Sequence, residues 1–336
     1  MKILAIDTSC DETAAAVTED TKIISNIIWS QASQHADFGG VMPSLAQRLH
    51  RERIDWVVDR AMLKAKCQMS NIDSVAVTVG PGLAIALGVG IDKAKKIAKK
   101  YKKKIIPINH IEGHLLSPLT QPSTIKFPAL GLVVSGGNTQ LILIKKIGQY
   151  EILAQTVDDA LGEALDKGAR LLGLGYPGGA ILEKFARVGN PDAYLLPSPL
   201  IDDKIKNRFS YSGLKTAMYR LIEKEKPLTK EKICNLAASF QNTAFDHIFN
   251  VLSYQINHQP LTIRHLLLGG GVANNNLLRS KLRKLLKSYG IKLLVPYSKK
   301  LCGDNAAMVG IAAYFKAQRE SLMNTDKIDR IPNLKI

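Results

Sequence analysis

The sequence lacks any hydrophobic run long enough to cross a bilayer as a helix. Its first apolar stretch, residues 3–6, ends at Asp7, whereas a membrane-spanning helix needs about 20 apolar residues and a secretory signal needs an apolar centre of about 7 to 15. The chain also lacks closely spaced cysteines, which argues against a disulfide framework and a zinc knuckle. We therefore expect a cytoplasmic protein without membrane contact. The cysteines are Cys10, Cys67, Cys234 and Cys302.

Acidic residues are scarce relative to basic ones, with 29 Asp and Glu against 46 Lys and Arg and a formal net charge of +17. An excess this large favours a polyanionic partner such as a nucleic acid. Eight of the lysines lie in residues 93–104, where the apolar positions keep helical spacing. An ordinary solvated helix has the same pattern, so both interpretations of the lysines stay open.

The chain is long enough, at 336 residues with 46% hydrophobic content, to form two domains with substantial cores. Three apolar runs separated by turns predict an antiparallel meander at its start, and alternating helix and strand patterns follow. This is the element order of a ribonuclease-H-like half. The expected strands cover residues 2–7, 14–18, 22–29, 74–79 and 104–108, and the expected helices cover residues 45–66 and 83–104.

A proline-rich segment at residues 118–128 predicts a linker, after which the strand-turn-strand pattern starts again. We therefore predict an α/β fold of two ribonuclease-H-like lobes with a central cleft, typical of the actin-like ATPase and sugar-kinase superfamily. Residues 1–124 would form the first lobe and residues 125–336 the second, whose last helix could pack back on the first. The expected strands of the second lobe cover residues 129–134, 140–145, 150–156, 265–268 and 292–295. Its expected helices cover residues 162–172, 236–254, 275–288 and 306–314.

Two histidines four residues apart, His110 and His114, can point the same way from one helical turn and share a metal ion. Glu112 lies midway between them, which fits neither metalloprotease signature, and its side chain should point away from the metal-binding face. Asp304, which precedes a predicted helix, is the candidate third ligand. One carboxylate with two imidazoles suits iron or zinc. Alternatively, the two histidines share this spacing by chance.

Glycine-rich turns follow two predicted strands of the second half, at residues 135–137 and 269–271. Without Cβ atoms, backbone amides can approach a phosphate closely, and a following helix adds its positive end. These turns indicate a nucleotide or acyl-nucleotide site, although each could be a simple tight turn. Asp166 lies among apolar residues of a predicted helix, where burial of an unpaired carboxylate is costly. It should therefore hydrogen-bond a ligand or pair with Lys167 or Arg170.

Further motifs occur in order along nearly the whole chain, at residues 7–13, 35–43, 80–83, 109–114, 134–137, 162–167, 175–179, 209–216, 237–241, 270–273 and 304–305. They resemble the motifs of the universal tRNA threonylcarbamoyladenosine transferases, a family once described as O-sialoglycoprotein endopeptidases. The chain is identified as a member of that family by this resemblance. Asn138 departs from it, because the family commonly has histidine after Ser-Gly-Gly, and we expect no proton transfer from that position.

The resemblance implies transfer of a threonylcarbamoyl group from threonylcarbamoyl-AMP to the exocyclic amine of the adenosine 3′ of the anticodon, in tRNAs that read codons beginning with A. It implies one divalent metal ion, iron or zinc, held by His110, His114 and Asp304. The implied partners are tRNA and other proteins of the threonylcarbamoyladenosine-synthesis complex, in bacteria a smaller fold-related paralogue and an ATPase. The residues implied for the adenylate are Val133, Val134, Ser135, Gly136, Gly137, Asp166, Gly179, Glu183 and Asn275.

An ATPase or kinase of the actin-like superfamily, acting on a small molecule, is the alternative function. Such enzymes bind ATP with Mg²⁺ through carboxylates, whereas a pair of imidazoles prefers a softer ion. The histidine pair and the full second half also argue against a scaffold-only role like that of the paralogue.

Overall fold

The computed structural model describes residues 1–120, 125–200, 206–258, 262–320 and 328–336, and the chain divides into two compact units. Unit 1 comprises Met1–Thr124 and Val295–Ile336, and unit 2 comprises Ile125–Leu294. The sequence-based division assigned residues 295–336, with Asp304, to the second lobe, whereas the structure places them in unit 1. Of the predicted linker, residues 121–124 lie outside the described residues.

The sheet of unit 1 has five strands in the order β3-β2-β1-β4-β5. β1 is antiparallel to β2 and parallel to β4, so an antiparallel meander is extended by two parallel strands on one side. The central strands are apolar on both faces, which is typical of a sheet covered by helices on both sides. The strands are β1 (Lys2–Asp7), β2 (Glu12–Glu19), β3 (Lys22–Ser30), β4 (Ser74–Gly80) and β5 (Lys104–Asn109).

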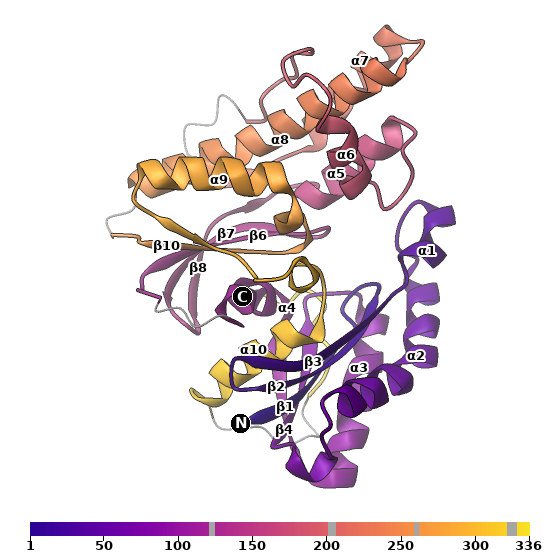
Figure 1. The fold of residues 1–336 in the computed structure, drawn as a ribbon, viewed down its shortest axis with the longest axis vertical. Coiled ribbons are helices and arrows are strands. Elements are labelled where there is room, and N and C mark those ends of the chain that lie inside the picture. Colours follow the sequence, from indigo (N-terminus) through magenta and orange to yellow (C-terminus); the bar gives the residue numbers. More distant parts are fainter. Residues whose placement is uncertain (121–124, 201–205, 259–261, 321–327) are drawn as a thin grey trace. The chain divides into compact units, whose positions relative to one another are not determined.

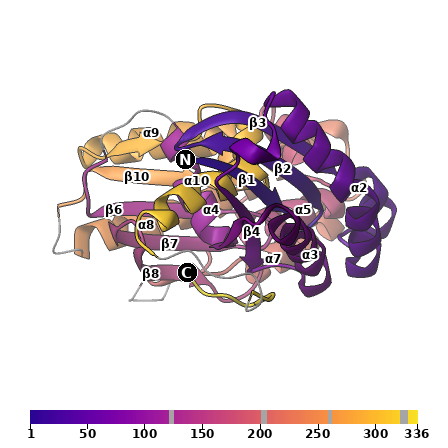
Figure 2. The ribbon, with the colours of Figure 1, turned by 90° about the horizontal axis from the view of Figure 1, so that it is seen from below.

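Helices α2 and α3 cover one face of this sheet, and α10 covers the other (Figures 1 and 2). Val17 of β2 packs in one core with Val57 of α2, whereas the next residue, Thr18, faces Gly310 of α10. Successive strand residues point to opposite faces, so the two helix layers lie on opposite sides. The helices of unit 1 are α1 (Ala32–His35), α2 (Pro43–Lys64), α3 (Ala84–Tyr101), α4 (His110–Leu116) and α10 (Ala306–Ala317).

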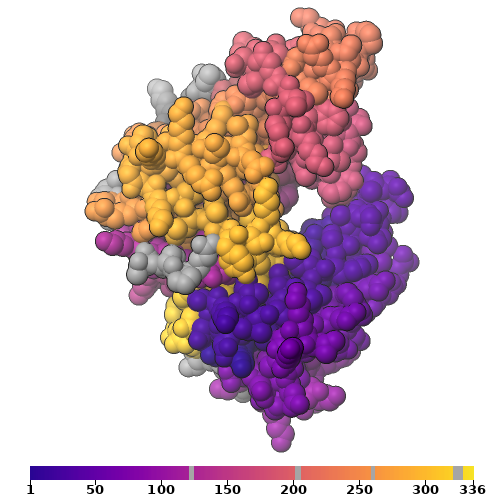
Figure 3. All heavy atoms as spheres, viewed as in Figure 1, coloured from indigo at the N-terminus to yellow at the C-terminus, as the bar shows by residue number. Residues whose placement is uncertain are grey.

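The composition of α10 explains why the C-terminal segment returns to unit 1. The helix is buried continuously from Ala306 to Ala313, and a helix that is apolar all round needs cover on more than one side. The sheet covers one side and α4 packs on another, and the yellow C-terminal segment lies beside the indigo N-terminal strands in Figures 1 and 3. None of the helices among the described residues is both long and apolar enough to cross a membrane.

The last residues of the chain form a strap over the carboxyl ends of β4 and β5. The Ile331 N–H donates to the Val79 carbonyl at 2.7 Å, and the Gly82 N–H donates to the Pro332 carbonyl at 3.1 Å. A Cβ on Gly80 would lie only 1.8 Å from the carbonyl oxygen of Ile331, so this glycine permits the close approach. The motif at residues 80–83 therefore has a clear structural use, which is to hold the C-terminal strap.

Unit 2 repeats the strand order of unit 1 and adds one strand, with the sheet order β11-β10-β6-β7-β8-β9. β6 is antiparallel to β7 and parallel to β10. In the same way, β1 is antiparallel to β2 and parallel to β4. The predicted repeat of a ribonuclease-H-like half is confirmed. The strands are β6 (Ala129–Val134), β7 (Thr139–Lys146), β8 (Gln149–Thr156), β9 (Arg208–Phe209), β10 (His265–Gly269) and β11 (Lys292–Leu294).

The long helices α8 and α9 lie side by side next to this second sheet (Figure 1). The helices of unit 2 are α5 (Leu161–Leu171), α6 (Gly179–Ala186), α7 (Ser212–Glu225), α8 (Lys230–His258) and α9 (Asn276–Ser288).

Candidate metal centre and nucleotide-binding residues

Helix α4 starts directly after β5 and presents the two histidines from one face. Asn109 is its N-cap, and the side-chain oxygen of Asn109 accepts the N–H of Ile111 at 2.8 Å and of Glu112 at 3.3 Å. A capping side chain of this kind satisfies backbone donors that the first turn leaves unpaired. His110 and His114 are thus one turn apart on a helix whose start is fixed, as the sequence predicts.

Asp304 comes from a distant part of the sequence, just before α10. The next residue, Asn305, is the N-cap of that helix, and its side-chain oxygen accepts the N–H of Met308 at 3.1 Å. The amide of Asn305 also donates to the Gly303 carbonyl at 2.8 Å, which fixes the chain on the other side of Asp304. A Cβ on Gly113 would lie 3.3 Å from Met308, so α4 and α10 pack closely.

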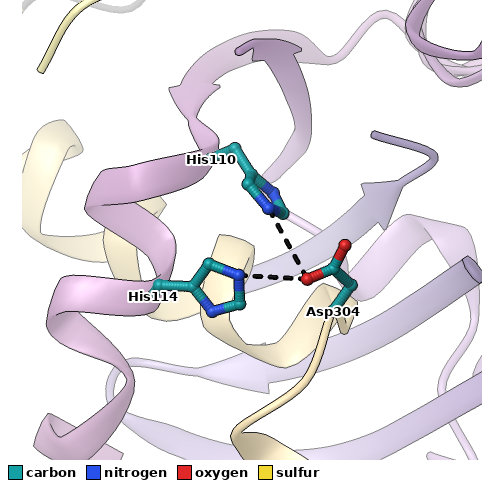
Figure 4. A group of neighbouring side chains, drawn as sticks. All are labelled: His110, His114 and Asp304. Atoms are coloured by element: carbon teal, nitrogen blue, oxygen red, sulfur yellow. Dashed lines mark hydrogen bonds and ion pairs between the residues drawn. The ribbon is translucent and has the colours of Figure 1, made fainter. Parts of the chain in front are cut away.

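Both imidazole rings point to the carboxylate of Asp304 (Figure 4). His114 Nε2 is 3.0 Å from Asp304 Oδ1, and His110 Nε2 is 3.6 Å from the same oxygen. The ring centroids are 4.6 Å apart, with the ring planes at 79°. One ligand atom from each of the three residues lies within 4.8 Å of the others. The structure therefore brings together the three side chains that the sequence singled out as metal ligands.

Burial and charge prepare these side chains to hold a cation. His114 is fully buried and His110 nearly so, and burial lowers the pKa of His110, although the charge of Asp304 opposes that effect. Burial alone would raise the pKa of Asp304, but the charge of His110 and the hydrogen bond from His114 outweigh it and lower that pKa to about 2. Two nitrogen donors and one carboxylate fit iron or zinc and leave open coordination positions.

Glu112 points away from this cluster. Its Oε1 is 3.2 Å from the guanidinium of Arg319, and its side chain is buried. The expected direction of Glu112 is thereby confirmed, and the metalloprotease arrangement, in which a glutamate acts beside the metal, is absent from α4.

Asp7 lies at the end of β1, against the other side of His110. Asp7 Oδ2 is 3.8 Å from His110 Nδ1, and Asp7 Oδ1 accepts the N–H of Ser9 at 3.2 Å. From the sequence, Asp7 is one of the acidic residues of the first turn, which could contact a ligand or cap the turn, and its proximity to His110 was missed. The sheet order was needed to find it, because only β4 separates β1 from β5, which leads into α4.

The residues expected to bind the adenylate lie in unit 2, around the end of β6. Ser135 is buried, whereas Gly136 and Gly137 are exposed. A Cβ on Gly162 would lie 2.6 Å from the Ser135 carbonyl oxygen, and one on Gly270 would lie 2.2 Å from the Val134 carbonyl oxygen. The start of α5 and the turn after β10 therefore both approach this strand end.

Asp166 ties α5 to the glycine pair at the start of α6. Its Oδ1 accepts the N–H of Gly178 at 2.9 Å and that of Gly179 at 2.7 Å. Lys167, which was one candidate partner for Asp166, lies instead 2.6 Å from Asp159 and 2.8 Å from Glu163.

Glu183 and Asn275 connect α6, α8 and α9. The carboxylate of Glu183 accepts two hydrogen bonds from Asn276, one from the backbone N–H at 2.9 Å and one from the side-chain NH₂ group at 3.1 Å. Asn275 is the N-cap of α9, and its amide donates to Gln241 of α8 at 2.8 Å. These expected adenylate-binding residues therefore form two linked groups of contacts at the amino ends of helices.

Comparison with known proteins places the chain in a family. A family model described as tRNA N6-adenosine threonylcarbamoyltransferase matches residues 22–311. The protein of that name from Bartonella tribocorum is 43% identical, over 99% of this chain and 94% of its own length. Its namesake from Thermosipho melanesiensis is 44% identical with both chains fully covered. The chain belongs to this family. The family that the motifs resembled is thereby confirmed.

Solved structures support the fold of this transferase family member. Component A of (R)-2-hydroxyglutaryl-CoA dehydratase from Acidaminococcus fermentans matches 95% of this chain and 100% of its own, with a TM-score of 0.55 and 12% identity. Full-length HypF matches 95% of this chain and 47% of its own, with a TM-score of 0.60 and 15% identity. At such identities the likeness concerns the fold alone, and it confirms the actin-like α/β class.

Proposed function

We propose that this protein transfers the threonylcarbamoyl group of threonylcarbamoyl-AMP to the exocyclic amine of the adenosine 3′ of the anticodon, in tRNAs that read codons beginning with A. Membership of the transferase family carries the proposal, because relatives with that name match nearly the whole chain at 43–44% identity. In this reaction the amine nitrogen bonds to the carbamoyl carbon and gives up one proton, the bond from that carbon to the phosphate oxygen breaks, and AMP leaves.

His110, His114 and Asp304 would hold one divalent ion, iron or zinc. Their convergence within 4.8 Å supports this assignment, as does a donor set of two nitrogens and one oxygen. When bound, such an ion polarises a carbonyl oxygen as a Lewis acid. The chain's own contribution is to hold the two rings and the carboxylate at fixed positions through the caps at Asn109 and Asn305.

The adenylate would bind in unit 2, at the end of β6 and the starts of α6 and α9. The exposed backbone of Gly136 and Gly137 can bring N–H groups close to the phosphate, where they would stabilise the charge that develops on the leaving AMP. Around this turn, the adenosine or threonyl part would be bound by Asp166, Gly179, Glu183 and Asn275, with Val133, Val134 and Ser135 forming the floor at the strand end.

The tRNA substrate agrees with the net charge of +17, because Lys and Arg contribute to binding through contacts with phosphates. We also propose that the protein works in the cytoplasm together with the smaller fold-related paralogue and the ATPase that bacteria use for threonylcarbamoyladenosine synthesis. Because salt weakens contacts between basic side chains and phosphates, we expect tRNA binding, and with it the activity, to fall as the salt concentration rises.

The test is mass spectrometry of nucleosides from tRNA incubated with the protein, its partner proteins, threonine, bicarbonate, ATP and the enzyme that makes the adenylate. We expect threonylcarbamoyladenosine in reactions with the wild-type protein and little in reactions with His114→Ala. The exposed His258 of unit 2 provides a matched control, since His258→Ala should keep the activity. Unmodified tRNA in the complete wild-type reaction would contradict the proposal.

The alternative, an ATPase or kinase acting on a small molecule, is not favoured by family membership. Incubation of the protein with ATP, Mg²⁺ and small-molecule acceptors separates the two functions. Rapid multiple-turnover phosphoryl transfer would support the kinase, whereas its absence together with modification of tRNA supports the transferase.

A further inference from the structure

Two buried polar atoms beside the candidate metal centre have no hydrogen-bond partner and face each other. They are Asp7 Oδ2 and His110 Nδ1, which are 3.8 Å apart. Asp7 is fully buried and His110 is 6% exposed. The hydroxyl groups of Ser9 and Thr78, which lie at the Asp7 carboxylate, are unpaired by the same distance criterion. Buried polar groups in proteins nearly always find a partner, so the facing atoms Oδ2 and Nδ1 indicate a hydrogen bond that forms in another state of the site.

The carboxylate of Asp7 has a fixed orientation. Its Oδ1 accepts the N–H of Ser9 at 3.2 Å, which leaves Oδ2 toward the ring of His110. On the opposite edge of the ring, Nε2 is 3.6 Å from Asp304 Oδ1. His110 therefore lies between two carboxylates, one beside each nitrogen, and the Asp304 side is the one that it shares with His114.

We propose that Asp7 is a positioning residue that prepares His110 to bind the metal ion. Asp7 accepts a hydrogen bond from the Nδ1–H group, so the proton stays on Nδ1 and the lone pair of Nε2 is directed to the ion held with His114 and Asp304. This inference rests on the proposed metal site. Imidazole ligands commonly donate their second N–H to a carboxylate, and loss of that partner typically weakens metal binding about 10- to 100-fold.

The charges support the same assignment. Two imidazoles are neutral ligands, so the carboxylates of Asp304 and Asp7 would supply the negative charge next to a divalent ion at this buried cluster. Buried charges are tolerated when they are paired or lie beside a metal. The two histidines differ in what lies beside Nδ1: Asp7 Oδ2 is 3.8 Å from Nδ1 of His110, whereas the carboxylate contact of His114 is made by Nε2 with Asp304, so the effect of Asp7 is specific to His110.

The test is a zinc titration of the full chain, in competition with a chromogenic chelator, for the wild type and three variants. Asp7→Asn keeps the shape and the acceptor for Ser9 but turns an NH₂ group toward Nδ1, which favours the proton on Nε2. We expect it to bind zinc about 10- to 100-fold more weakly. Asp7→Glu keeps the carboxylate and should recover part of the loss. Asp73→Asn is the matched control, because Asp73 accepts the N–H of Lys2 at the other end of β1.

Equal zinc affinity in wild type and in folded Asp7→Asn protein would overturn the role of Asp7 and leave the metal site standing. No zinc binding by the wild type would overturn the metal site and this role with it. Nitrogen-15 NMR of the zinc-loaded wild type decides the question even if Asp7→Asn fails to fold. We expect the proton of His110 on Nδ1 and zinc on Nε2, and zinc bound to Nδ1 would contradict the proposal.

Discussion

At the scale of single residues, three side chains separated by up to 194 positions in sequence form one cluster of ligand atoms. The spacing of His110 and His114 could be interpreted from the sequence, because helical geometry alone puts such residues on one face. Asp304 followed from its place before a helix. The role of Asp7 could not be predicted in this way, since it depends on which strands are neighbours.

Replacement of His110 by alanine should remove metal binding without unfolding the protein. One of three ligands is lost, so the affinity should fall by more than the roughly 100-fold that marks the loss of an orienting partner. His110 Nδ1 has no hydrogen-bond partner, so the metal-free variant should melt within a few degrees of wild type. Chelator competition and thermal melting measure the two effects. Unfolding of the metal-free variant would give His110 a structural role.

His247 of unit 2 should make stability depend on pH. Burial, reinforced by the positive charge of Lys206, lowers its pKa from 6.5 to about 4. Between these values the unfolded chain binds a proton that the folded chain does not, so stability is full above pH 6.5 and falls as the pH drops toward 4. The loss approaches about 3 kcal/mol, from 1.36 kcal/mol per pKa unit.

Urea unfolding between pH 7 and pH 4 checks this prediction with the variant His247→Gln. Glutamine does not titrate, and its side-chain oxygen can still accept the N–H of Ser210, which His247 Nε2 accepts at 3.2 Å. The variant should lose less stability than the wild type on acidification. Parallel curves for both proteins would show that His247 does not cause the dependence.

At the scale of helices and strands, apolar periodicity predicted the paired strands of both sheets to within about two residues, except the two-residue strand β9, which was not predicted. It failed for α6 and α7, because glycines occupy their first turns and usually indicate a turn or loop. Side chains from elsewhere stabilise these starts. Asp158 accepts the N–H of Tyr211 at 2.8 Å at the start of α7, as Asp166 accepts the N–H of Gly179 at the start of α6. Such distant capping is invisible in a local pattern.

The packing of α10 on β2 depends on Gly310. A Cβ there would lie 2.6 Å from the hydroxyl oxygen of Thr18. Alanine normally favours a helix over glycine by about 1 kcal/mol, but overpacking costs about 1 to 3 kcal/mol. Gly310→Ala should therefore destabilise the protein. Gly213→Ala in α7 is the matched control, because a Cβ there meets nothing within 4 Å. Urea unfolding compares them, and a stabilised Gly310→Ala variant would contradict the packing.

At the scale of the whole molecule, the repeat of two sheets with equivalent strand orders was predictable, because each half begins with the same meander of apolar runs. The assignment of residues 295–336 was predictable only in part. Sequence order suggests that this segment belongs to the second lobe, with a last helix that could pack back on the first, whereas burial of the apolar surface of that helix on the first sheet decides its place. Unit 1 is consequently built from both ends of the chain, and it contains all three candidate metal ligands.

Metal binding should therefore stabilise unit 1 selectively. An ion at 100 times its dissociation constant contributes about 2.7 kcal/mol, or about a 100-fold slowing of exchange through unfolding of the unit that holds it. Hydrogen exchange with and without zinc should show this slowing in the strands β1 and β4 and in α10, and little change in α9. Protection confined to unit 2 would locate the ion elsewhere.

In unit 1, His110, His114 and Asp304 are expected to hold a single ion. Anomalous diffraction from crystals grown with iron or zinc tests it most directly, because the peak reports the metal itself. We expect one strong peak in unit 1, within bonding distance of both Nε2 atoms and Oδ1 of Asp304. A peak bound by other residues, or none at this cluster in protein that retains its metal, would contradict it.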